Sequence, residues 1–130
     1  TPPPATPLLP DLLAVVDVIV PNEHEVELLG GVDALLASGV GAVVVTLGER
    51  GARVHTEGRV TQVDSLAVDA VDTTGAGDTF TGYLAAGLSE GLDLVTAATR
   101  GCAAGALATT RAGAVPSIPS RAEVDAVSGV

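Results

Sequence analysis

Residues 67–90 read AVDAVDTTGAGDTFTGYLAAGLSE, and this stretch decides the fold that the sequence predicts. Ala67 to Val71 is expected to form a strand that leads into the loop after it. A loop with glycines at positions 75 and 77 follows, and Thr79 to Glu90 has the periodicity of a helix. A strand, a glycine loop and a helix in this order are typical of proteins that alternate strands with helices.

The sequence on both sides of this stretch predicts more elements of the same kinds. The expected strands are Asp17–Val20, Ala42–Leu47, and a hairpin of Ala52–Thr56 and Arg59–Val63 around a Glu57-Gly58 turn. The expected helices are 11–16, one that Asn22 caps and Gly30-Gly31 ends, Val32–Ser38, Leu92–Thr109, and one that opens with a Ser120–Glu123 capping box. We therefore predict an α/β fold, with a mainly parallel sheet flanked by helices and a hairpin at one edge.

Composition and charge exclude several classes of function. The net charge of −10 argues against nucleic acid as a partner, because such binding relies on basic side chains that neutralise phosphates. All six basic residues are arginines, so a Walker A loop and a protein-kinase site, which both need a lysine, are excluded. The acidic surface is expected to serve solubility. Phe80 and Tyr83 are the only aromatic residues, so the core must consist of alanine, valine and leucine.

The expected location of the chain follows from one cysteine and from missing signals. Cys102 cannot form an internal disulfide, and its apolar neighbours predict a buried thiol in a reducing, cytoplasmic setting. Apolar runs are too short for a membrane span, and the proline-rich lead-in at 1–10 does not resemble a signal peptide. We expect no membrane partner.

The glycine loop carries the strongest chemical signal. Small residues from Gly75 to Gly77 let backbone amides gather at a helix N-terminus, which favours an anion such as a phosphate. A carboxylate at Asp78 could accept a proton from a hydroxyl that attacks the γ-phosphorus. Taken alone, however, these four residues fit an ordinary helix start equally well.

Four segments resemble the signatures of the ribokinase-like, or PfkB, carbohydrate kinase family, and the likeness is strongest to ribokinases. They occur in the family's order and are the Asn-x-x-Glu motif at 21–25, the nucleotide loop at 46–51, the second signature at 70–82 and the C-terminal loop at 110–117. Alone, Asn22 with Glu25 fits a capping box, 46–51 fits a turn, and Arg111 fits a solvated charge. The likeness covers almost the whole chain.

The resemblance implies an ATP-dependent kinase that phosphorylates a sugar hydroxyl. Asp78 would be the catalytic base, and the amides of Gly75, Ala76, Gly77 and Asp78 would form the anion hole. The ATP site would be lined by Thr46, Leu47, Gly48, Glu49, Arg50 and Gly51, together with Asn22. Asn22 and Glu25 would organise Mg²⁺, largely through water. A monovalent cation, usually K⁺, would lie near Asp72, Thr74, Ala108, Arg111, Gly113 and Ser117, mostly on backbone carbonyls.

The resemblance also implies that residues 1–130 match the C-terminal, nucleotide-binding half of such a kinase domain. The absent half would supply most sugar contacts, so we expect a homodimer, pairing with a separate first half, or a fragment. A non-catalytic nucleotide-binding or partner-binding module derived from such a kinase is the alternative function. His24 lacks the second histidine of a zinc-protease helix, because Leu28 stands in its place, and His55 is expected to be an edge residue.

Overall fold

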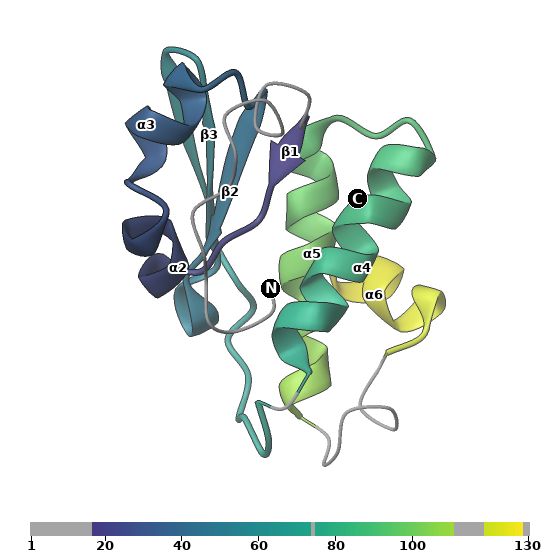
Figure 1. Ribbon diagram of the computed structural model, residues 1–130. Helices are drawn as coiled ribbons and strands as arrows, with labels where there is room; N and C mark the ends of the chain where they lie inside the picture. The colour runs from purple at the N-terminus through teal and green to yellow at the C-terminus, as the bar shows by residue number, and fades with distance from the viewer. Residues whose placement is uncertain (1–16, 74, 111–118, 129–130) are drawn as a thin grey trace. The chain divides into compact units, whose positions relative to one another are not determined.

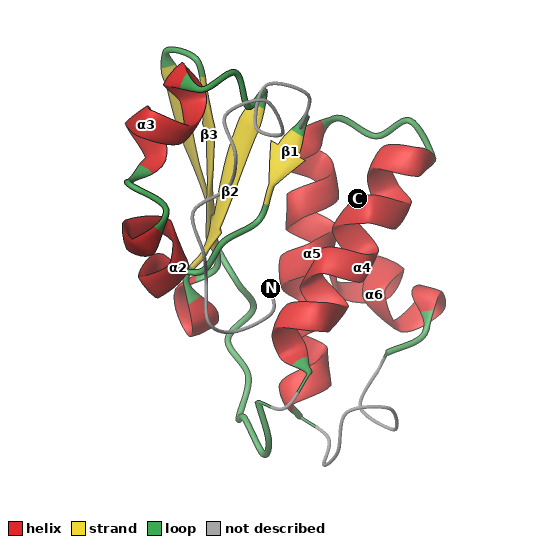
Figure 2. Ribbon diagram, in the orientation of Figure 1, coloured by secondary structure: helices red, strands yellow, loops and turns green. Residues whose placement is uncertain are grey.

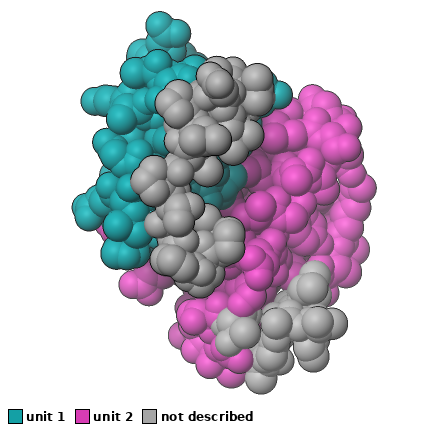
Figure 3. All heavy atoms as spheres, in the orientation of Figure 1, with its two compact units in different colours: residues 1–47, 53–62 teal, residues 48–52, 63–130 magenta. Residues whose placement is uncertain are grey.

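The computed structural model describes residues 17–73, 75–110 and 119–128 (Figure 1). The lead-in expected at 1–10 and the helix expected at 11–16 lie outside this part of the chain. The chain divides into two compact units (Figure 3). Unit 1 comprises residues 1–47 and 53–62, and unit 2 comprises residues 48–52 and 63–130. Each unit is described separately below.

Unit 1 is built around a sheet with the strand order β1-β2-β3-β4 (Figure 2). Its strands are β1 (Val18–Ile19), β2 (Ala42–Thr46), β3 (Ala52–Thr56) and β4 (Arg59–Val63). β1 and β2 run parallel, with Val18 opposite Ala42 and Ile19 opposite Val43. β3 and β4 form the predicted edge hairpin, in which Gly58 supplies the positive φ of 73° that the two-residue turn needs.

Two short helices, α2 (Glu23–Leu28) and α3 (Val32–Ala37), pack against β2. Their shared core consists of Leu35, Val40, Val43, Val45 and Leu47, with half-buried aliphatic side chains around it. Val43 and Val44 point to opposite faces of the sheet and are both fully buried. The unbroken valine run thus predicted correctly that this strand is covered on both sides. The α/β class is confirmed.

Unit 2 contains the helices α4 (Ala76–Ser89), α5 (Leu94–Thr109) and α6 (Arg121–Ser128). α4 and α5 lie side by side in Figure 1 and form the largest contact between elements of the chain. α6 packs on α5 through Val124, which is fully buried against Ala103 and Ala104. The Tyr83 hydroxyl of α4 donates a hydrogen bond to the Pro119 carbonyl at 2.6 Å, which fixes the start of the last helix.

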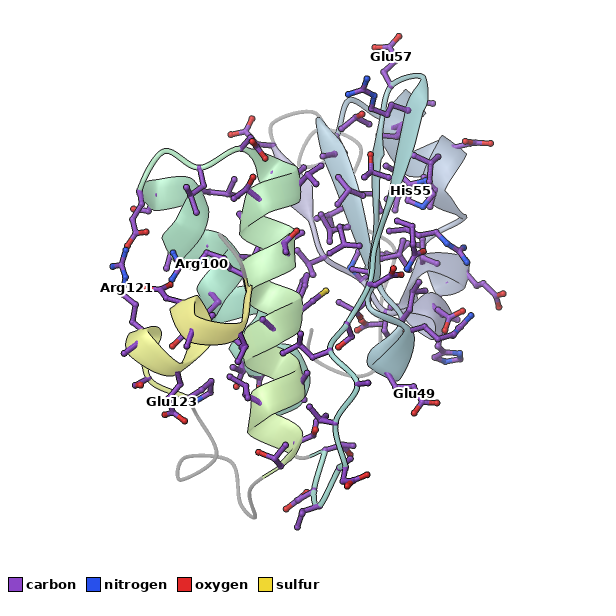
Figure 4. The ribbon with its side chains drawn as sticks, turned by 180° about the vertical axis from the view of Figure 1, so that it is seen from behind. Glu49, His55, Glu57, Arg100, Arg121 and Glu123 are labelled. Carbon is purple, nitrogen blue, oxygen red and sulfur yellow. The ribbon has the colours of Figure 1, made fainter. Side chains whose placement is uncertain are left out.

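Ion pairs join the three helices of unit 2. Arg100 is buried, and its guanidinium contacts Asp125 at 2.7 Å and Glu90 at 3.5 Å. Glu90 also contacts Arg121 at 2.5 Å. Figure 4 labels Arg100 and Arg121, which lie on the same side of this helical unit. A buried cation at the junction is thereby matched by two carboxylates.

One predicted strand is wrong. Ala67 to Val71 is irregular and exposed, and Val71 keeps 69% of its surface in water. A strand needs a neighbour for its backbone groups, but the amide of Val71 instead donates to the Thr109 carbonyl at the end of α5. The following helix begins at Ala76, three residues before the predicted start at Thr79. No helix within the described residues is both long and apolar enough to cross a bilayer.

Candidate functional site

Two of the four sequence motifs meet where β1 and β2 end. The amide of Thr46, the last residue of β2, donates to the Pro21 carbonyl at 2.9 Å, and Asn22 pairs with Thr46 in a parallel bridge. Ligands of open α/β sheets bind outside the carboxyl ends of parallel strands. The Asn-x-x-Glu motif and the first residue of the predicted nucleotide loop therefore share the edge at which such a site forms.

Asn22 and Glu25 form a reciprocal capping box at the start of α2. The Asn22 Oδ1 atom accepts from the Glu25 amide at 2.8 Å, and the Asn22 amide donates to Glu25 Oε1 at 3.0 Å. This confirms the capping interpretation of the pair, and the Mg²⁺ role stays a prediction. Within the described residues no three His, Cys, Asp or Glu side chains cluster as a metal site would require.

The predicted nucleotide loop is a turn, and its backbone at residue 51 leaves no space for a side chain. Gly48–Arg50 form a 3-10 turn whose side chains, including the labelled Glu49 in Figure 4, are exposed. Gly51 has a φ of 90°, and a Cβ atom there would lie 1.9 Å from the Val63 carbonyl oxygen. The backbone of residue 51 therefore runs directly against the end of β4. Contact of Thr46 to Gly51 with ATP stays a prediction.

The glycine loop opens α4 without any side-chain cap. Gly75 is the N-cap residue, with a left-handed φ of 77°. The Ala76 amide donates to the Thr73 carbonyl at 3.2 Å, and the Thr79 amide begins the helical pattern by donating to Gly75. Between them, the amides of Gly77 and Asp78 have no helical acceptor, and none is found for them in the described part of the chain.

Asp78 and its neighbours leave room for a ligand at this helix start. The Asp78 side chain is exposed in the first turn of α4, where the helix dipole favours negative charge. A Cβ atom on Gly77 would meet no other atom within 4 Å. Two amides without an acceptor among the described residues, an open glycine and a carboxylate in one helical turn can together hold an anion and accept a proton next to it. Gly75, and not Asp78, is the N-cap of α4, and the catalytic role of Asp78 stays a prediction.

The predicted cation site is described only in part. The amides of Val71 and Asp72 both donate to the Thr109 carbonyl, at 2.6 Å and 3.0 Å, so Asp72 lies at the end of α5 where Ala108 also is. The cation role of Asp72 and Ala108 stays a prediction. The other predicted ligands lie outside the described residues; they are Thr74, Arg111, Gly113 and Ser117.

The two histidines and the cysteine lie on helices and a strand, outside the glycine loop. His24 is exposed on α2, and His55 is half-buried on β3, as labelled in Figure 4. Burial lowers the pKa of His55, and the nearby Arg53 lowers it further, against a smaller opposite effect of Asp33. Cys102 is buried as predicted, and burial, with a contribution from Asp64, raises its pKa to about 12. A thiol with this pKa is not a nucleophile at neutral pH.

Sequence reasoning missed the buried ion pairs of Arg100. Its only signal in the sequence is a basic residue on the apolar side of a helix rich in alanine and glycine. Arg100 stands among the buried positions of α5, and its Nε atom has no partner among the described residues. This group holds helices together at the C-terminal end of α4, the opposite end from Asp78.

Comparisons with known proteins agree with the motifs. Residues 1–121 match the model of the pfkB family carbohydrate kinases. A ribokinase of Haemophilus influenzae is 39% identical over 94% of this chain and 44% of its own length. A structure of Arabidopsis thaliana ribokinase complexed with ribose and ATP has a TM-score of 0.86 at 32% identity, over 97% of this chain and 45% of that one.

A second solved structure extends the same likeness. A ribokinase II from E. coli in complex with ATP and Mg²⁺ has a TM-score of 0.83 at 33% identity, over 90% of this chain and 40% of that one. The chain therefore spans less than half the length of the relatives that it matches. The family match covers nearly all of the residues described above, and with the four motifs in order it assigns the chain to the pfkB family of carbohydrate kinases.

Proposed function

We propose that this chain carries the ATP site and the catalytic base of a kinase that phosphorylates a sugar hydroxyl. One observation carries the proposal: the first turn of α4 offers the unpaired amides of Gly77 and Asp78 together with the exposed Asp78 carboxylate. These are the two functions that phosphoryl transfer asks of a protein, namely stabilisation of charge on the transferring group and acceptance of the hydroxyl proton.

In the proposed step, the sugar oxygen attacks the γ-phosphorus while Asp78 takes the proton from that oxygen. The bond from the γ-phosphorus to the bridging oxygen breaks, and ADP leaves with the electron pair. The amides of Gly77 and Asp78 hold the γ-phosphoryl oxygens during the transfer, whereas the Ala76 amide, also expected in the anion hole, donates to the Thr73 carbonyl. Because those donors are backbone groups, fixed by the start of a helix, they need no reorganisation as charge develops. Bound Mg²⁺ supplies neutralisation of the phosphate charge.

The remaining roles follow from the family resemblance and from ligands of related structures. The Arabidopsis ribokinase holds ribose and ATP, the E. coli ribokinase II holds ATP and Mg²⁺, and a fructokinase of Vibrio cholerae was solved with fructose, ADP and a potassium ion. We assign Thr46 to Gly51 to ATP contacts and Asn22 with Glu25 to Mg²⁺ through water. We assign Asp72 and Ala108 to a monovalent cation.

The proposal includes the setting in which the chain works. The rest of such a kinase, in the same polypeptide or in a separate one, or a second copy of this chain, would complete the sugar site. A cytoplasmic location is supported by the one thiol of the sequence, Cys102, which is buried and unpaired.

A second candidate is a nucleotide-binding module without turnover. One observation is compatible with it, because the amides of Gly77 and Asp78 can hold a phosphate whether or not a hydroxyl is transferred. The two candidates share the anion site and differ in whether a sugar hydroxyl reaches Asp78.

Calorimetry with Mg-ATP, followed by a phosphorylation assay over a panel of sugars with the chain in its full-length or complemented context, separates them. Binding with turnover supports the kinase, and binding without turnover supports the module. In the assay, Asp78→Asn is expected to lower kcat about 10²- to 10⁴-fold. Asp93→Asn is the matched control, because Asp93 also lies at a helix start but caps the Thr96 amide at 2.7 Å. Undiminished turnover of Asp78→Asn contradicts the assignment of the base.

A further inference from the structure

One face of α5 contacts the glycine loop and the helix after it at three points. Gly101, Gly105 and Thr109 follow one another at intervals of four residues, so they lie on the same side of the helix. A Cβ atom on Gly101 would lie 2.9 Å from the carbonyl oxygen of Phe80. A Cβ atom on Gly105 would lie 3.2 Å from the Ala76 carbonyl oxygen. The Thr109 carbonyl accepts the two amides that begin the loop.

These contacts hold the loop from both of its ends. At the first end, the amides of Val71 and Asp72 are fixed to the Thr109 carbonyl at 2.6 Å and 3.0 Å. At the second end, Ala76 lies against Gly105 as the first residue of α4. The atom in contact is a backbone carbonyl, which cannot rotate away as a side chain can. The distance between α5 and the first turn of α4 is therefore set by the lack of a side chain at position 105.

We infer that Gly105 is a positioning residue for the phosphoryl-transfer site. By letting α5 approach the Ala76 carbonyl, it fixes the first turn of α4 and so the direction of the Gly77 and Asp78 amides. The kinetic consequence rests on the proposed function, whereas the geometric consequence does not. The two can be measured separately.

The geometric test compares two glycines of the same helix pair. Gly105→Ala places a methyl group at the glycine loop. Gly87→Ala places one at the other end of the same contact, where the new Cβ atom would lie 3.0 Å from Ala97 Cβ. Gly87 is about 16 Å further along α4 than Ala76, at the rise of an α-helix.

In amide NMR spectra of the full chain, Gly105→Ala is expected to shift the Gly77 and Asp78 resonances. The Val71 and Asp72 resonances, at the other end of the loop, should move with them. Gly87→Ala is expected to leave all four in place. Equal shifts in both variants, or none in Gly105→Ala, overturn the inference.

The kinetic test asks whether the displacement affects the chemical step. Gly105→Ala is expected to lower kcat about tenfold and to change the KM for ATP less than about twofold, because small displacements of catalytic groups act on the transition state. Gly87→Ala, compared at equal folded fraction, is expected to keep kcat near that of the unmodified chain. Equal loss of kcat in both variants would mean that the role is merely structural.

A second variant covers the case in which Gly105→Ala does not fold. Phe80→Leu replaces the ring that lies against Gly101 by a smaller side chain. It is expected to lower kcat in the same way. A kcat that Phe80→Leu leaves unchanged then overturns the inference. If the amide shifts occur but the full-length or complemented kinase phosphorylates no sugar, the proposed function fails and the geometric inference stands.

Discussion

The backbone of Asn22 lies beside that of Thr46, in a parallel bridge that the hydrogen bond from the Thr46 amide to the Pro21 carbonyl secures at 2.9 Å. Two motifs that are far apart in the sequence thus end at one edge of the sheet. Because the Asn22 side chain also caps α2, it links the end of a strand to the start of a helix. Its replacement can therefore affect stability and function at once, and the two effects need separate variants.

The capping role of Asn22 and Glu25 can be separated from their proposed Mg²⁺ role by variants that keep one and remove the other. Asn22→Ala removes the cap and is expected to cost about 1 kcal/mol of unfolding free energy, whereas Asn22→Ser keeps a capping oxygen and is expected to cost little. Glu25→Gln keeps the acceptor for the Asn22 amide but removes the charge. If Glu25 helps to organise Mg²⁺, this variant needs more Mg²⁺ for half-maximal ATP binding at unchanged stability. An unchanged Mg²⁺ titration would restrict Glu25 to its capping role.

Gly51 is expected to be the least replaceable glycine of the turn after β2. Gly51→Ala forces a Cβ atom against the Val63 carbonyl and keeps a positive φ, so we expect a loss of about 3 kcal/mol or more in urea unfolding. Gly48→Ala is the matched control, because its φ is also positive, at 62°, but its Cβ atom would meet nothing within 4 Å. Its expected cost is about 1 kcal/mol, from backbone strain alone. Equal costs would show that the close approach to β4 is not what requires glycine.

Replacing the acidic partner of Arg100 is expected to cost more unfolding free energy than replacing Arg100 itself. The side chain of Arg100 is 8% exposed and that of Asp125 is 46% exposed. Asp125→Asn therefore leaves a cation that water cannot reach well, and we expect a loss of about 2–3 kcal/mol. Arg100→Met leaves carboxylates that water can solvate and fills the space, so its expected loss is smaller, about 1 kcal/mol. Arg121→Ala, at a 64% exposed position, should cost under about 1 kcal/mol. The reverse order of the first two variants would contradict this account.

The buried thiol predicts how stability depends on alkaline pH. The pKa of Cys102 is about 12 in the folded chain, against 9.0 for a free thiol. The folded state thus holds a proton that the unfolded chain releases, so the free energy of unfolding falls between about pH 9 and pH 12 and does not respond to this group below pH 9. Cys102→Ala should remove that part of the slope, and the difference between the two chains isolates the thiol. Thiol reagents should react with the native chain at pH 8 only through opening of unit 2.

Local signals in the sequence predicted local structure well. The capping boxes of Asn22 with Glu25 and Ser120 with Glu123 are present, because each needs only residues three positions apart. The hairpin of β3 and β4 has the predicted bounds, because glycine at 58 decides the turn. The glycine loop opens a helix as predicted, because Gly75 both marks the loop and caps α4, whereas the roles of the site residues stay predictions.

Features that depend on distant partners were not predictable. The stretch 67–71 has the pattern of a strand, but its first amide partner is Thr109, far along the chain. The sequence places Arg100 on a helix but does not show that Glu90 and Asp125 come to meet it. Nothing in the composition indicates that Gly105 faces Ala76. Such contacts depend on the crossing angle between two helices. The hydrophobic periodicity of a single helix does not reveal that angle.

The contact between Phe80 and Gly101 has a consequence for how this sequence can diverge. The single phenylalanine of the chain fills the space that the glycine leaves. A side chain at residue 101 would meet both the Phe80 ring and the Phe80 carbonyl oxygen, each at 2.9 Å, so a smaller residue 80 would relieve only the first of these contacts. In descendants of this chain, position 101 is therefore expected to stay glycine whichever residue stands at position 80 on the other helix.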